Sequence, residues 1–262
     1  MYDPDGTANL RKIPIFAGTM GPKVKDILLR YGFATVGLVF VALGVALSII
    51  SNLGTAPLSC PSYVLNLKWP VLSVGTFTLL VNMSYLLVQL ALLRKDFKAE
   101  YLMQIVASAL FGYLIDGWLW ALAWLQPSHF VLRLVLSVLA GAVTALGVSI
   151  EVAANAWMLS AEMTVGAISQ VFKKPFSPVK IAMDSLMVVL SALLSALFFA
   201  NPFGSGAWTG LGDVLLARTD GVVIGLGTLL LAILPGLMMR WTDPLVGRIV
   251  KGISGKSAGT KK

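Results

Sequence analysis

The sequence predicts an all-α, polytopic membrane protein with six transmembrane helices and two short re-entrant or interfacial helices, built as two inverted three-helix repeats. The first observation is that the 262 residues are 57% hydrophobic and 12% charged, whereas soluble domains carry about 25% charged residues. The second is that apolar runs recur, each long enough to cross roughly 30 Å of hydrocarbon. The third is a resemblance between the two halves of the chain.

The elements follow from the positions of these apolar runs. The predicted spans are 33–51, 72–93, 101–124, 131–151, 179–199 and 221–240. Two weaker segments, 53–67 and 153–172, lie between the first and second spans and between the fourth and fifth. The predicted division of the chain is a cytoplasmic arm at 1–30, membrane repeats at 31–125 and 126–240, and a basic cytoplasmic tail at 241–262.

The distribution of lysine and arginine predicts the topology. With six crossings, seventeen basic residues fall on one side and only Lys68, Arg133 and Arg218 on the other. Cytoplasmic loops of membrane proteins carry the excess of Lys and Arg. We therefore expect a bacterial cytoplasmic (inner) membrane protein with both termini in the cytoplasm. If 153–172 alone crossed, or if both weak segments crossed, basic loops would change sides, so each weak segment is expected to enter and leave on one side.

The two weak segments leave two alternatives open. Irregular backbone at membrane depth is tolerated only where it is buried in protein or lines a wet cavity. Amphipathic helices can instead lie flat on the membrane surface. In the first alternative, 53–67 and 153–172 are re-entrant and mark where a binding site would lie.

The second half of the chain repeats the pattern of the first. Residues 43–49 align with 146–152, and Asn52 then falls against Asn155. Each half reads as helix, short segment, helix, helix. Because three crossings is an odd number, the second half must insert upside down, and many secondary transporters are built as such inverted repeats.

Polar groups inside the spans identify candidate site residues. Each ionised side chain at the centre of a span costs roughly 2.5–3.5 kcal/mol, so it needs a partner, water or protonation. Polar and small residues repeat at helical spacing, such as Gln104, Ser108, Gly112 and Asp116, which predicts stripes that face one interior. The candidate substrate- or ion-binding residues are Asn52, Ser62, Asn82, Gln104, Asp116, Glu151, Asn155, Glu162 and Asp184. Interhelical hydrogen bonding explains the neutral members equally well, and an interfacial ion pair is the alternative role for Lys180 and Asp184.

Composition and missing motifs narrow the function. One cysteine and one histidine give no internal disulfide and no His-rich metal site, so no metal or other cofactor is predicted. No Walker A, dinucleotide-binding or hydrolase motif occurs, which argues against an enzyme. The net charge of +8 is explained by membrane orientation rather than by nucleic acid. The expected partners are the lipid bilayer and a small solute of unknown identity, with protons and a membrane partner subunit left open.

Particular motifs resemble a known family. Residues 52–59, with the sequence Asn-Leu-Gly-Thr-Ala-Pro-Leu-Ser, are followed by 72–76 and Asn82, and 151–155 and 179–184 form later motifs. These resemble the YczE/YyaS/YitT-type family of bacterial integral membrane proteins over most of residues 33–240. The resemblance implies a bacterial inner-membrane location and a transport or accessory role, and it implies no ligand or catalytic residue.

The leading functional hypothesis is a small-solute transporter or permease-like protein with its site between the repeats. Glu151, Glu162 and Asp184 would bind protons or cationic groups, and the amides with Asp116 would hydrogen-bond the solute. The alternatives are a non-transporting accessory protein, such as a solute-binding subunit or scaffold of a membrane complex, and an intramembrane enzyme acting on lipid.

Overall fold

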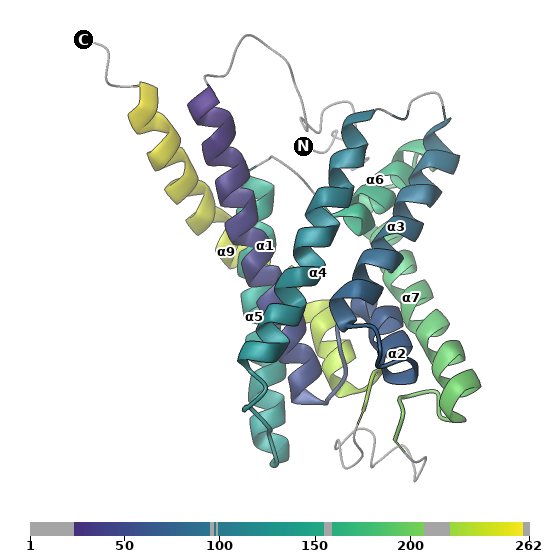
Figure 1. Ribbon diagram of the computed structural model, residues 1–262. Helices are drawn as coiled ribbons and strands as arrows, with labels where there is room; N and C mark the ends of the chain where they lie inside the picture. The colour runs from purple at the N-terminus through teal and green to yellow at the C-terminus, as the bar shows by residue number, and fades with distance from the viewer. Residues whose placement is uncertain (1–23, 95–96, 98, 155–158, 207–220, 259–262) are drawn as a thin grey trace.

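The chain folds into helices arranged roughly along one direction (Figure 1). The computed structural model describes residues 24–94, 97, 99–154, 159–206 and 221–258. The helices are α1 (Val24–Ser51), α2 (Cys60–Lys68), α3 (Val74–Leu93), α4 (Met103–Ala121), α5 (Phe130–Ala154), α6 (Ser160–Phe172), α7 (Phe176–Phe199) and α9 (Leu226–Ala258). Short 3-10 turns, η1 (Pro57–Ser59) and η3 (Ala99–Leu102), precede α2 and α4. The all-α, polytopic prediction is confirmed.

The six long helices coincide with the six predicted spans, with differences at two outer ends. Helix α1 begins at Val24 rather than near residue 33, and α9 runs to Ala258, into the predicted tail. A helix satisfies its own backbone groups in lipid and in water alike, so nothing forces it to stop where the apolar run stops. Residues 1–23 of the predicted arm lie outside the described residues.

Four helices are long and apolar enough to cross a membrane by themselves. They contain the stretches Arg30–Ser51, Val74–Leu93, Phe130–Ala154 and Pro178–Phe199. Helix α4 carries Gln104 and Asp116, which lower its apolar character, yet it connects the end of α3 with the start of α5 at opposite ends of the bundle (Figure 1). It must therefore cross between them. In α9 the apolar part is Leu226–Met239.

The two halves have the same element order and opposite directions. The order of long helix, half-helix, long helix, long helix occurs as α1, α2, α3, α4 and again as α5, α6, α7, α9. Figure 1 shows that α1 and α5 run antiparallel, as do α3 and α7. The contacts repeat as well, because α1 packs on α4 as α5 packs on α9, and α6 packs on α3 as α2 packs on α7. Each half-helix is thus embedded against the opposite repeat.

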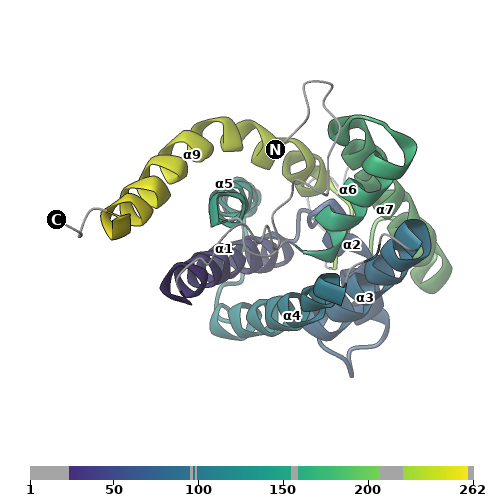
Figure 2. The same ribbon diagram turned by 90° about the horizontal axis from the view of Figure 1, so that it is seen from above.

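Viewed from above, the helices form two groups (Figure 2). Helices α1, α5 and α9 make one group, in which α1 and α5 pack together along their length. The half-helices α2 and α6 with the long helices α3 and α7 make the other. Helix α4 contacts both α1 and α3, so it joins the groups. We call them the α1–α5 group and the half-helix group.

The two half-helices lie toward opposite ends of the molecule (Figure 1). Helix α6 lies toward the end that carries Arg94, Lys173, Lys174 and Lys180, which we call the basic end, and α2 lies toward the opposite end (Figure 1). Their buried residues include Cys60 and Val64 on α2 and Met163, Val165 and Ala167 on α6, all at most 1% exposed. Burial on several sides favours the re-entrant alternative over a helix lying flat on the membrane surface.

Non-helical backbone next to α2 is paired with the segment that precedes α9. Thr55 N donates to Val223 O at 3.0 Å, and Gly227 N donates to Leu53 O at 2.7 Å. Val222 N donates to Asn52 Oδ1 at 2.9 Å. Leu53, Thr55 and Val223 are fully buried, so water cannot replace these hydrogen bonds. The first and last parts of the membrane domain are therefore held together by backbone groups that lipid could not satisfy.

Glycines set the close approach of α1 and α5. A Cβ atom on Gly147 would lie 2.7 Å from Gly37 O and 2.7 Å from Val41 N, both of them backbone atoms. On Gly37 it would lie 2.8 Å from Gly147 O. Small residues at such positions let helix backbones pack closely in membranes.

We predict that Gly147→Ala destabilises the protein while Gly117→Ala does not. The added methyl group at residue 147 overpacks a backbone contact, which costs about 1–3 kcal/mol. A Cβ atom on Gly117 has nothing within 4 Å, so the alanine only gains helix propensity. Thermal unfolding of the two purified variants, followed by tryptophan fluorescence, measures the difference. Equal midpoints would show that the α1–α5 contact is looser than described.

Candidate functional site

A hydrogen-bonded pair of glutamines holds the half-helix α6 against α3 and α4. Gln89 Nε2 on α3 donates to Gln104 Oε1 at 3.0 Å, and Gln104 Nε2 donates back to Gln89 Oε1 at 3.1 Å. The Gln89 Nε2 atom also lies 2.9 Å from Ser160 O and 3.0 Å from Thr164 Oγ1 on α6, so its two hydrogens are shared among three acceptors. Both glutamines are at most 3% exposed. This network, which we call the glutamine network, fixes the start of α6 inside the bundle.

The start of α6 reaches the core of the bundle. Its N-cap residue Leu159 is extended and packs in a cluster with residues of α1 and α4, including Leu38, Val41 and Phe111. The helix ends at Lys173, which has a left-handed conformation with φ of 50°, and Lys174 N then donates to Ser169 O at 3.0 Å. Helix α6 therefore runs from the interior outward to the basic end.

Tyr85 lies where three helices of the half-helix group meet. Its ring packs in a cluster with Ala161 and Val165 of α6 and with Met183 and Met187 of α7. The side chain is 4% exposed, and within the described residues its hydroxyl oxygen has no hydrogen-bond partner. A buried polar atom left unpaired costs about 1–3 kcal/mol, so such an atom in a native structure needs an explanation.

Charged side chains surround this tyrosine. Glu162 lies in the first turn of α6, and one of its carboxylate oxygens, Oε2, is buried without a partner in the described part of the chain. On α7, Lys180 Nζ donates to Asp184 Oδ1 at 3.0 Å, with side-chain exposures of 31% and 19%. Ala161 and Met183, which pack with Tyr85, are the chain neighbours of Glu162 and Asp184, so both carboxylates come from the turns that surround the ring.

A third carboxylate approaches from the α1–α5 group. Glu151 near the end of α5 is 8% exposed, and its Oε1 atom has no partner among the described residues. Its Cγ atom lies against Gly37 of α1. The acidic residues thus come from both helix groups. We call Tyr85, Glu151, Glu162, Lys180 and Asp184 the acidic site.

The structure places the remaining sequence-predicted residues in several environments. Ser62 on α2 is 1% exposed with an unpartnered Oγ atom, and Gln104 belongs to the glutamine network. Asn82 Nδ2 donates to Thr78 O at 2.9 Å within its own helix. Asn155 lies outside the described residues.

Asp116 and Asn52 accept backbone hydrogen bonds. Gly75 N, in the first turn of α3, donates to Asp116 Oδ1 at 2.8 Å. This bond satisfies one of the free N–H groups at a helix start, so Asp116 contributes to folding by capping α3 from α4. It lies at the other end of α3 from the glutamine network. Asn52 likewise bonds Val222 N, as described above.

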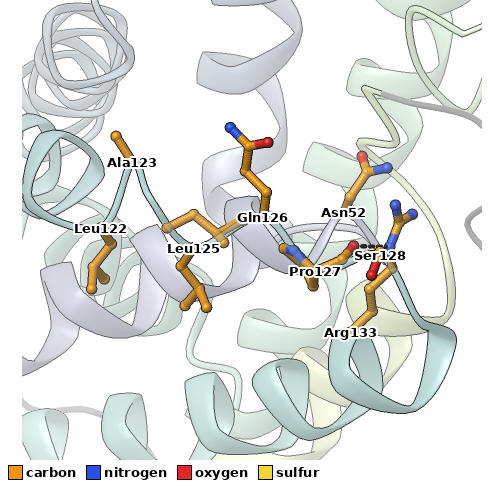
Figure 3. A pocket seen from close by; sticks show the side chains of 9 residues that line it. Asn52, Leu122, Ala123, Leu125, Gln126, Pro127, Ser128 and Arg133 are labelled. Atoms are coloured by element: carbon orange, nitrogen blue, oxygen red, sulfur yellow. Dashed lines mark hydrogen bonds between the residues drawn. The ribbon is translucent and has the colours of Figure 1, made fainter.

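A separate pocket opens near the junction of α4 and α5, away from the basic end. Its volume is about 480 Å³, and its lining residues are Ile50, Asn52, Leu122, Ala123, Leu125, Gln126, Pro127, Ser128 and Arg133. Figure 3 shows the leucine side chains apart from Asn52 and Arg133, with Arg133 Nε donating to Pro127 O at 2.8 Å. Among the predicted site residues this pocket contains Asn52.

Helical spacing in the sequence points to two residues near the site that were not among the predicted binding residues. Tyr85 and Gln89 continue the polar stripe of Thr78 and Asn82 at helical spacing, yet neither was among the predicted binding residues. Thr164 and Arg133 had no such signal, because only their tertiary partners give them a role.

Comparison with known proteins gives one result. A family model described as "Family of unknown function (DUF6198)" matches residues 28–244. No curated protein matches the chain. No solved structure matches it either.

We predict that Gln89 and Gln104 are energetically coupled. Gln89→Leu leaves the buried amide of Gln104 without its partner, and Gln104→Leu does the converse. Each single change should therefore lower stability by about 1 kcal/mol or more. The double substitution should cost less than the sum, with a coupling of about 0.5–1.7 kcal/mol, as interhelical hydrogen bonds in membranes show. Unfolding free energies of the four proteins in detergent provide the measurement. Additive losses would mean that the network does not anchor α6.

Proposed function

The chain belongs to the DUF6198 family, a family of unknown function, and from this premise we propose that it is a small-solute membrane transporter. The acidic site would be its solute site, and no enzymatic reaction is assigned to it. One observation carries the proposal. Buried polar atoms of Tyr85, Glu151 and Glu162 have no hydrogen-bond partner among the described residues, and the helices that carry them, α3, α5 and α6, come from two oppositely oriented repeats.

The architecture supports transport because it can present one site to two sides. Inverted repeats with interrupted helices hold the substrate near the midplane and expose it by rocking one group of helices against the other. Here Glu162 and Asp184 belong to the half-helix group and Glu151 to the α1–α5 group. Movement between the groups would change the distance from Glu151 to Glu162 and with it the access to the site.

The difference in hydrogen bonding between the glutamine network and the acidic site also supports a solute site. The glutamine network and the segment beside α2 leave their polar groups paired, as a purely structural bundle requires. In the acidic site, Tyr85 Oη, Glu162 Oε2 and Glu151 Oε1 have no partner among the described residues. A solute, protons or water would supply the missing partners.

The charge pattern supports an orientation for this transporter. Arg94, Lys173, Lys174 and Lys180 are at the basic end, and Lys68 and Arg133 belong to the opposite end. By the positive-inside rule we place the basic end in the cytoplasm of a bacterial cell, with both termini on that side. The motif resemblance to YczE/YyaS/YitT-type proteins supports the same bacterial membrane.

A solute-pool uptake experiment tests the proposal. Purified protein is reconstituted into phosphatidylethanolamine and phosphatidylglycerol liposomes and incubated with a pool of amino acids, polyamines, nucleosides, sugars and organic acids. Mass spectrometry of washed liposomes is expected to show accumulation of at least one solute above protein-free liposomes. Loss of a contact worth about 1.4 kcal/mol predicts roughly tenfold slower uptake for Glu162→Gln.

Asp116→Asn is the matched control for that experiment. It is also a carboxylate-to-amide change inside the bundle, but Asp116 contacts the start of α3 rather than the acidic site, and asparagine keeps an acceptor oxygen. Its uptake should stay close to that of the wild type. Absence of accumulation for every solute, with and without a pH gradient of either sign, would contradict the transport proposal. Uptake that requires a co-purified partner would instead favour an accessory subunit.

A further inference from the structure

The charges of the acidic site are unbalanced. Among the described residues, this site holds the carboxylates of Glu151, Glu162 and Asp184 and one ammonium group, that of Lys180, and neither Glu151 nor Glu162 forms an ion pair. Lys180 is already engaged at 3.0 Å by Asp184, within one turn of the same helix. The ion pair is close to neutral as a unit, so the carboxylates on α5 and α6 are left without a matching cation.

From this arrangement we infer that the solute of the acidic site carries an organic cationic group. The inference rests on the proposed transport function and deepens it by naming a substrate class. An ammonium or guanidinium group would supply the donors that the unpartnered Glu162 Oε2 and Tyr85 Oη atoms lack. Hydrogen bonds between such a group and a carboxylate are about twice as strong as neutral ones.

Tyr85 supplies the second, independent reason. It is more than nine-tenths buried, and its hydroxyl has no partner in the described residues. The faces of aromatic rings attract cations, most strongly when water is excluded. The neighbouring thioethers of Met183 and Met187 are polarizable and adapt to an irregular organic shape. These groups fit the charged head of an organic cation.

The lining also distinguishes an organic cation from a metal ion and from an anion. In the part of the chain that is described, no three His, Cys, Asp or Glu side chains are placed to hold a metal ion. Leu58, Val81 and Val179 pack beside Tyr85 and give the site an apolar wall for hydrocarbon. A helix N-terminus normally favours an anion, but Glu162 of the chain itself occupies the first turn of α6.

Binding of matched probe pairs to the full-length protein in detergent tests the inference. Each cation is compared with an uncharged isostere: guanidinium with urea, ethanolammonium with ethylene glycol, and choline with its neutral carbon isostere. We expect at least one cation to raise the midpoint of thermal unfolding and to bind in titration calorimetry, with its isostere at least about tenfold weaker. Glu162→Gln should lower the affinity for that cation by about tenfold or more, while Asp116→Asn should change the affinity by less than about twofold.

Several outcomes would overturn the inference. They are equal binding of a cation and its isostere, no binding of any of the three cations, and Glu162→Gln binding that equals the wild type. If Glu162→Gln does not fold, Tyr85→Phe replaces it in the experiment. This change keeps the ring and removes the hydroxyl, and it should also lower the affinity for the cation. Uptake of only neutral or anionic solutes in liposomes would contradict the cation inference and leave the transport proposal standing. Cation binding without any uptake would contradict the transport proposal and leave the cation inference standing.

Discussion

The structure depends on one constraint, which is that every polar backbone group inside an apolar bundle must find its partner within the protein. The chain interrupts its helices twice, before α2 and before α6, and each interruption exposes such groups. Before α2, backbone atoms of Leu53 and Thr55 are matched by Gly227 and Val223, more than 160 residues later. Beside α6, Gln89 and Thr164 perform the corresponding task with side chains. The packing of each half-helix on the opposite repeat follows from this need.

Against that background, the acidic site contains three of the buried atoms that lack a partner among the described residues, and Ser62 Oγ and Gln170 Oε1 are the others. Gln89 makes several hydrogen bonds in a fully buried position, whereas Tyr85, one turn earlier on the same helix, has a buried hydroxyl with none among the described residues. A chain that can satisfy a glutamine so thoroughly could have placed phenylalanine at residue 85 at no cost in hydrogen bonding. The retained hydroxyl and the nearby carboxylates therefore support a role in binding, and the surrounding network holds them in position.

Sequence reasoning predicted the membrane fold because hydropathy and charge act over local windows. The six long helices, the two half-helices and the opposite orientation of the halves follow from run lengths and from the positions of Lys and Arg. The polar stripes predicted which helix faces turn toward one interior. What the stripes could not predict is the partner of each group, because Asp116 meets Gly75 across two helices and Asn52 meets Val222 at a separation of 170 residues. Such pairings depend on how helices cross, and local periodicity contains no information about crossing.

The central claim is that Glu162 faces a water-accessible path between the repeats. Accessibility of a cysteine at residue 162 in native membranes tests it directly, after the buried Cys60 has been replaced by alanine. A small, membrane-impermeant methanethiosulfonate reagent reacts only where water reaches the thiol. The account predicts that Glu162→Cys is modified far faster than Leu186→Cys, whose side chain lies on the outer surface of α7 at 57% exposure, facing lipid. Equal, negligible modification of both cysteines would show that no aqueous path reaches Glu162 and would contradict the account.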